Sequence, residues 1–242
     1  MSKTLANLQT GVRVYLDEAN AADFLDSEVT RSINYGYHDV VANVIDVYED
    51  FYNVTSPIQL STVVNQQEYS IGNSGLIKIR RVEINYNPSD ANSTALRATA
   101  IKSDEMPLRL ASNALGGTGL FSAGYYVNGQ VSSQIIGFTP IPQNAGTNNI
   151  SIWGIVVPSD LSATTDTITI PYPDQYGYLV ELRAAAILLR KGQQSENYAA
   201  KYMEEYREGI LEMKNFLKER QSDGVWLIAD AQYEDTIFDH PL

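Results

Sequence analysis

Several kinds of residue are missing or rare in this chain of 242 residues. There is no cysteine, which excludes a disulfide framework and any thiolate metal site. The longest uninterrupted apolar run is only Ala184–Leu189, far short of the roughly 20 residues that span a membrane. The first ten residues contain one lysine and no apolar stretch of signal-peptide length. We therefore expect a soluble protein with no membrane contact and no secretion signal.

Basic residues are also scarce. The chain has 17 lysines and arginines against 29 aspartates and glutamates, a net charge of −12. The imbalance is concentrated in residues 1–54, with a net charge of −6, and in residues 221–242, which have five acidic and no basic side chains. Because lysine and arginine supply most of the affinity for phosphates, this charge argues against a protein that wraps nucleic acid. Passing DNA would be repelled.

Apolar residues follow helical spacing at both ends of the chain and strand spacing between them. In residues 1–56 they recur every three or four positions, which predicts a short helix and a longer helix capped by Asp26. The period changes to two over residues 57–172 and returns to helical spacing over 173–220, while 221–242 form an acidic, aromatic tail. The predicted fold class is α+β. A helical bundle from both terminal segments would carry an inserted antiparallel β-sandwich or barrel-like domain and an extended C-terminal tail.

Four local signals refine the inserted β domain. The alternation in Leu76–Tyr86 slips by one residue, which predicts a β-bulge or a sharp bend in the strand. The Asn128-Gly129 dipeptide lies between β-forming residues and predicts a hairpin. Trp153 belongs to a strand that is apolar on both faces, so we expect it to be buried. Ile168 and Ile170 predict a last short strand.

The groups that usually perform catalysis are few. His38, one of two histidines, lies mid-helix beside Asp39, which is typical of a surface residue and not of a positioned base. The Gly116–Gly119 stretch lacks the Lys-Ser/Thr pair of a phosphate-binding loop. Side chains of metal-ligand type gather only near the C-terminus, at Asp230, Glu234, Asp235, Asp239 and His240. Since a metal needs ligands fixed by surrounding contacts, we favour a solvated or partner-docked tail, and predict no catalytic residue, metal site or cofactor.

Two ladders of side chains mark the last predicted helix. Glu205, Glu208 and Glu212 share one face, where a catalytic carboxylate pair is conceivable. Lys201 precedes Glu205 by four residues and favours a solvated, salt-bridged face instead. If several copies lined a pore, this acidic stripe would present a negative wall to DNA. The tyrosines at 198, 202 and 206 have no basic neighbours on their face, so core or subunit interface is favoured over base stacking.

A series of motifs in order resembles a known family. It comprises Phe138–Pro142 (Phe-Thr-Pro-Ile-Pro), a strand, Pro158–Ser162 (Pro-Ser-Asp-Leu-Ser), Ile170-Pro171, Tyr176 and a long Ala/Leu helix. Together with the two-helix start, this order resembles the head-to-tail adaptor, or connector, proteins of tailed bacteriophages. The tail tubular protein A-like group is the nearest type. The resemblance spans about residues 3–220 and leaves the tail unmatched.

The resemblance implies a structural role without catalytic residues. Such adaptors form rings, usually dodecameric, below the portal ring and above the tail, where they extend the DNA channel. The implied partners are the portal protein, tail nozzle, tube or fibre proteins, other copies of the chain, and passing double-stranded DNA that is not specifically bound. The implied location is the virion neck between head and tail, with the host cytoplasm during assembly. The acidic stripe would face the channel.

Two further contact sites are predicted. The apolar residues of the tail are expected to anchor on the portal or a neighbouring subunit, with packing on their own subunit as the open alternative: Trp226, Leu227, Ile228, Tyr233, Ile237 and Phe238. The glycine- and serine-rich loop over residues 112–124 is expected to contact tail or fibre proteins through Leu115, Leu120 and Phe121.

Two other functions are compatible with the composition. A carbohydrate- or surface-binding module is suggested by 16 tyrosines, two tryptophans and the β insert. That function would require aromatic side chains exposed on a sheet face, whereas Trp153 is expected to be buried. An acidic hydrolase that uses a glutamate pair is the second alternative.

Overall fold

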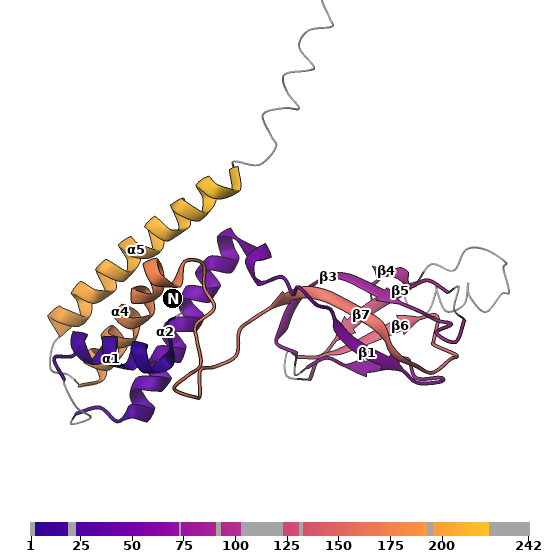
Figure 1. Ribbon diagram of the computed structural model, residues 1–242, viewed down its shortest axis with the longest axis horizontal. Coiled ribbons are helices and arrows are strands. Elements are labelled where there is room, and N and C mark those ends of the chain that lie inside the picture. The colour runs from indigo at the N-terminus through magenta and orange to yellow at the C-terminus, as the bar shows by residue number, and fades with distance from the viewer. Residues whose placement is uncertain are drawn as a thin grey trace, which may run out of the picture. The chain divides into compact units, whose positions relative to one another are not determined.

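The computed structural model describes residues 3–18, 23–72, 74–90, 93–102, 123–130, 133–192 and 196–222. The chain divides into two compact units, which we call the helical unit and the β unit. The helical unit combines Met1–Phe51 with Asp160–Leu242, and the β unit is Tyr52–Ser159. Figure 1 shows helices contributed by both ends of the chain and a barrel-like sheet formed by the middle. The predicted α+β class is therefore confirmed.

In the helical unit, α4 (Pro173–Gly192) contacts each of α1 (Leu5–Tyr15), α2 (Asp26–Val47) and α5 (Glu196–Ser222). The apolar stripes expected on these segments form its core. The fully buried members of that core include Leu8, Val12, Val29, Ile33, Val40, Val44, Leu179, Val180, Ala184, Ala186 and Met213. A short 3-10 helix, η1 (Glu49–Tyr52), follows α2.

Two expectations about this unit were wrong. Asp26 is the first residue of α2 and not its cap; Leu25 occupies the capping position without a side-chain hydrogen bond. The Asp26 carboxylate is instead paired with the Arg13 guanidinium of α1 at 2.6 Å, an interaction that spacing along one helix does not reveal. The short strand expected at Ile168 is absent from the sheet. The segment around it instead runs alongside the start of the chain, where it forms a single β-bridge between Thr4 and Thr167.

The β unit is built from seven described strands in one sheet, with the order β1-β7-β3-β4-β5-β6-β2. The pairs are antiparallel except for β4 and β5, which run parallel, and the sheet curls into a nearly closed barrel (Figure 1). The strands are β1 (Ile58–Thr62), β2 (Glu68–Ser70), β3 (Leu76–Ile84), β4 (Leu96–Ala100), β5 (Gly124–Asn128), β6 (Ile135–Thr139) and β7 (Gly146–Val156). Their inward residues form a second core that includes Val82, Ile84, Ile136, Phe138, Ile150 and Ile152.

The local signals in the β unit had mixed outcomes. The bulge is confirmed, because the β3–β7 register shifts between Leu76 and Lys78 and again between Ile79 and Arg81. The β5–β6 hairpin is confirmed as well, and Gly129 has a φ of +92° that favours glycine. Its second strand begins at Ile135, however, so the connection is longer than the two residues that the dipeptide suggested.

Candidate interaction surfaces

A partly buried ion pair joins the start of the chain to the middle of α4. Lys3 Nζ lies 2.7 Å from Glu181 Oε1, and Glu181 is only 7% exposed. The carboxylate has room because α1 carries glycine at position 11; a Cβ there would lie 2.4 Å from the Glu181 carboxyl carbon. This pair fixes where α1 lies on α4.

A second polar cluster joins the end of α1 to the start of α2. Arg13 pairs with Glu18 at 2.8 Å and with Asp26 at 2.6 Å, and it also donates to the Phe24 carbonyl oxygen at 3.2 Å. Glu18 Oε1 accepts the backbone N–H groups of Asp23 at 2.6 Å and of Phe24 at 3.1 Å. The guanidinium of Arg13 therefore connects the end of α1 to the start of α2.

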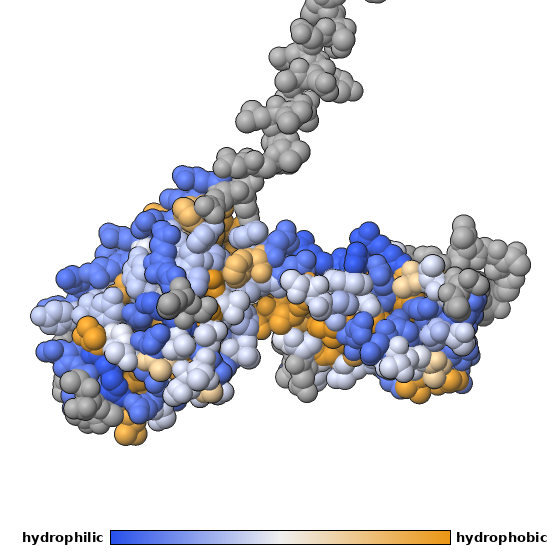
Figure 2. Space-filling view, viewed as in Figure 1, coloured by the Kyte–Doolittle hydropathy of each residue, from blue (hydrophilic) through white to orange (hydrophobic). Residues whose placement is uncertain are grey.

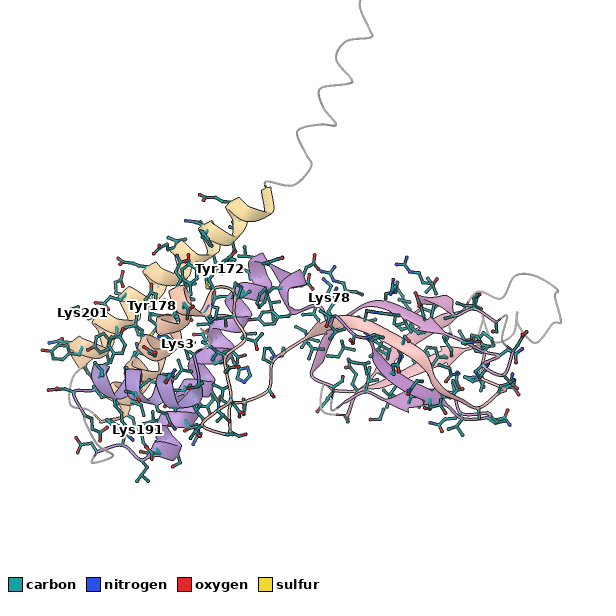
Figure 3. The ribbon with its side chains drawn as sticks, viewed as in Figure 1. Lys3, Lys78, Tyr172, Tyr178, Lys191 and Lys201 are labelled. Atoms are coloured by element: carbon teal, nitrogen blue, oxygen red, sulfur yellow. The ribbon has the colours of Figure 1, made fainter. Side chains whose placement is uncertain are left out.

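The acidic stripe on α5 lies beside a surface hollow. Glu205 is half-buried, whereas Glu208 and Glu212 are exposed. With Tyr15, Tyr178, Leu182 and Gly209, these residues line a hollow of about 330 Å³. In Figure 3, Tyr178 lies on α4 and Lys201 near the start of α5. The structure thus brings the three predicted stripe residues to one place.

The carboxylates give this hollow a negative potential. The pKa of Tyr178 is raised first by burial and then by Glu212 and Glu205. The pKa of Tyr15 is likewise raised by burial, with further contributions from Glu181 and Glu205. Among the described residues, no group of three histidine, aspartate or glutamate side chains is placed to hold a metal ion.

Weak ion pairs lie on the surface of α5. Lys201 lies 3.7 Å from Glu205, and Arg207 lies 3.7 Å from Glu204. These distances fit the solvated, salt-bridged face expected from the spacing, and such exposed pairs contribute little stability.

The three tyrosines of the ladder differ in burial. Tyr198, in the first turn of α5, is 60% exposed, whereas Tyr206 is buried. Tyr202 lies between these extremes, donating to the Tyr15 carbonyl oxygen at 3.1 Å and meeting the Tyr15 ring edge-on. Tyr206 is therefore a core residue, as one of the two expectations had it, while a subunit-interface role for the exposed Tyr198 stays a prediction.

His38 is a partly exposed surface residue, as its position suggested. Its Nε2 lies 2.6 Å from Asp160 Oδ1, and its ring stacks on Tyr37. The sequence neighbour Asp39 instead pairs with Arg183 at 2.8 Å. The partner Asp160 is 122 residues away in sequence, so spacing along α2 had no means of identifying it.

The β unit has a basic and aromatic outer face that the sequence analysis missed. Val82 and Ile84 point inward. Because side chains alternate along a strand, Arg81 and Glu83 point outward. Arg81 is in register with Trp153 of β7, and its guanidinium carbon lies 3.8 Å from the indole ring centroid. Trp153 is thus only half-buried and is covered by an arginine, which corrects the expectation of full burial.

The same outer face extends onto β4. Glu83 pairs with Arg81 at 3.3 Å and lies opposite Arg97 in the β3–β4 register. Arg97 is exposed. We call Arg81, Glu83, Arg97 and Trp153 the outer-face patch. Figure 2 shows hydrophilic residues along the upper edge of the β unit in this view.

Charge is divided unequally between the two units. The sequence of the helical unit contains 24 acidic and 11 basic residues, a net charge of −13, whereas that of the β unit contains 5 acidic and 6 basic residues, a net charge of +1. The excess negative charge of the chain therefore belongs entirely to the helical unit.

Two predicted sites lie outside the described residues. They are the tail residues Trp226, Leu227, Ile228, Tyr233, Ile237 and Phe238, and the loop residues Leu115, Leu120 and Phe121. In the part of the chain that is described, no helix is long and apolar enough to span a membrane.

A family model described as SU10 adaptor protein matches residues 3–227, which include both units. No curated protein matches the chain.

Proposed function

Because this chain belongs to the SU10 adaptor protein family, we propose that it is a structural protein of a bacteriophage virion that joins the portal to the tail. The observation that supports this is the extent of the family match, which covers residues 3–227 and thus both compact units. The neck of the virion is the corresponding location, reached from the host cytoplasm during assembly. We propose further that the chain is an adaptor of the tail tubular protein A-like type, as the narrower resemblance implies.

In the proposed assembly, copies of the chain form a closed ring, dodecameric by the resemblance, around the path of the DNA. A ring requires contacts between two different surfaces of neighbouring copies. The helical unit, with its net charge of −13, would line the channel and present Glu205, Glu208 and Glu212 to it. Repulsion between these carboxylates and the phosphates would let DNA slide without binding specifically.

The remaining predicted contacts complete this picture. The tail, through Trp226, Leu227, Ile228, Tyr233, Ile237 and Phe238, would bind the portal or a neighbouring copy. Leu115, Leu120 and Phe121 would contact the tail nozzle, tube or fibre proteins. No enzymatic step is part of this proposal.

The two alternative functions receive less support. A carbohydrate-binding face needs an open aromatic platform, and Arg81 covers the ring of Trp153. A glutamate-pair hydrolase would use the α5 stripe, where Glu205 pairs with Lys201 and both Glu208 and Glu212 are exposed. Carboxylates that face solvent are not held in the fixed geometry that a paired acid–base reaction requires.

Labelling of virions tests the proposed function. An antibody raised against the purified chain and coupled to gold is expected to label the junction between head and tail in electron micrographs. Disrupted particles should release the label together with portal rings. Labelling confined to the distal tail or to the capsid surface would contradict the proposed position, and absence from virions would contradict a structural role.

A further inference from the structure

The C-terminal tail carries a chemistry that its own helical unit does not complement. Residues 223–242 contain five acidic and no basic side chains, together with Trp226, Tyr233 and Phe238. The rest of the helical unit has 19 acidic and 11 basic residues, a net charge of −8. Docking on that unit would therefore set like charges against each other.

The β unit is the one part of the chain without excess negative charge. On its outer-face patch, Arg81 and Arg97 flank a single carboxylate, Glu83, and Trp153 lies directly beside Arg81. Neighbouring outward residues on paired strands lie about 5 Å apart. The two arginines and the indole thus form one compact surface that joins positive charge to an aromatic ring.

The side chains of this surface are accessible. The Arg81 side chain is 45% exposed, and Arg97 is exposed. Thr99, two residues beyond Arg97 on the same face of β4, is exposed as well. An acidic peptide with aromatic side chains meets here two guanidinium groups, which can donate charge-assisted hydrogen bonds to its carboxylates and make cation–π contacts with its aromatic rings.

We propose that the acidic tail of one copy, residues 223–242, docks on the outer-face patch of a neighbouring copy. The inference rests on the proposed adaptor function, because a ring needs contacts between two different surfaces. The tail and the patch are such a pair, one acidic and aromatic, the other basic and aromatic. The contact links the helical unit of one copy to the β unit of the next.

The absence of cysteine gives a direct test on the full-length chain. One variant carries Thr99→Cys beside the patch, and a second carries Ala229→Cys in the tail. Mixed at high protein concentration with oxidised glutathione, they are expected to form a mixed disulfide dimer. Its yield should exceed that of a control pair, in which Asn215→Cys on the exposed side of α5 replaces Thr99→Cys, by about tenfold, since docking raises the local thiol concentration.

Charge substitutions identify the surface. Arg81→Glu with Arg97→Glu in the Thr99→Cys partner is expected to reduce the mixed dimer to the level of the control pair. Arg81→Lys with Arg97→Lys should restore most of it, which excludes misfolding as the cause. Arg207→Glu, at an exposed position of α5, should leave the yield unchanged. High salt, at about 1 M, should lower the dimer yield of the Thr99→Cys and Ala229→Cys pair in which both arginines are kept. At that concentration exposed charges are screened within about 3 Å.

Each other outcome overturns the inference. Equal yields from the patch and control pairs at the highest soluble concentration would show that the tail does not dock there. A disulfide that forms within one chain of the Thr99→Cys/Ala229→Cys double variant, at high dilution and without dimers, would place the tail on its own subunit. If the tail cross-links to purified portal protein and not to the patch, the portal and not a neighbouring copy is the partner of the tail. None of these results bears on virion labelling at the neck, so the proposed function is tested separately.

Discussion

Glu181 of α4 lies against Gly11 of α1 so closely that a Cβ on residue 11 would be 2.4 Å from its carboxyl carbon. Glycine in a helix interior ordinarily costs about 0.5–1 kcal/mol relative to alanine, so Gly11→Ala would stabilise an isolated helix. In this chain the end of the Glu181 side chain would have to move away from the new methyl group. Because this carboxylate is buried and paired with Lys3, the move should cost more than the helix gains.

Gly11→Ala is therefore expected to lower the free energy of unfolding by about 1–3 kcal/mol, the usual cost of overpacking. Chemical denaturation measures it. Thr10→Ala, at the neighbouring exposed position of α1, is the matched control and should change the free energy of unfolding by about 0.5 kcal/mol or less. A gain in stability from Gly11→Ala would show that Glu181 does not occupy this space.

The Lys3–Glu181 pair should behave as a coupled unit. Lys3→Met leaves a buried carboxylate without its ammonium partner and is expected to cost about 1–3 kcal/mol. Glu181→Leu should also destabilise the chain, since it leaves the lysine unpaired and packs a new apolar group against α1. In a double-mutant cycle the two changes together should cost less than the sum of the single changes. Strict additivity would show that the 2.7 Å contact adds nothing to stability.

The Arg13 cluster predicts that lysine is a poor replacement for arginine. A lysine has one ammonium group and cannot reach Glu18, Asp26 and the Phe24 carbonyl oxygen together. Arg13→Lys should lower the free energy of unfolding by about 1 kcal/mol or more. Arg31→Lys, at an exposed site on α2 where the guanidinium contacts Tyr35, should have little effect. Equal effects of the two substitutions would show that the Arg13 contacts do not hold the end of α1 to the start of α2.

These clusters show what sequence could and could not provide. Helical stripes such as Val29–Val44 and the alternation in the strands were predictable, because burial on one face imposes a period that one sequence reveals. Lys3–Glu181 and His38–Asp160 join residues 178 and 122 positions apart, and no local pattern encodes such pairs. The stripe on α5 was predictable from helical spacing alone.

The outer-face patch was missed for a different reason. Arg81, Arg97 and Trp153 come from three strands, and only the β7–β3–β4 register brings them together. That register includes two shifts within β3, which change the face on which each later residue lies. The bulge was predicted from the slip in alternation, but its pairing partner was not.

Asp166 predicts an acid-sensitive contribution to stability. The backbone N–H groups of Ser162 and Ala163 donate to its carboxylate and hold its pKa below the ordinary value of 3.8. A carboxyl group with a lowered pKa in the folded state stabilises the fold above its unfolded value, and this stabilisation is lost as the pH falls through the folded value. Asp166→Asn should therefore destabilise the chain at neutral pH, and its difference from the wild type should shrink as the pH falls below 3.8 and vanish below the lowered folded pKa. Denaturation midpoints measured across that range test it; a constant difference at every pH would contradict it.

The acidic stripe gives a prediction for the assembled particle. Substituting lysine for Glu205, Glu208 and Glu212 changes six units of charge per subunit on the surface proposed to face DNA. Around a ring, this would replace repulsion of the phosphates by attraction, and each added phosphate contact strengthens binding and its salt dependence. Virions with the triple variant should assemble but release their genome more slowly in low salt, with the rate recovering as salt is raised, measured by the fluorescence of a dye that binds emerging DNA. Lysine at Glu196, exposed near the start of α5 and away from the stripe, is the control and should leave the release rate unchanged. Equal release rates for the triple variant and the wild type at low salt would place the stripe away from the channel.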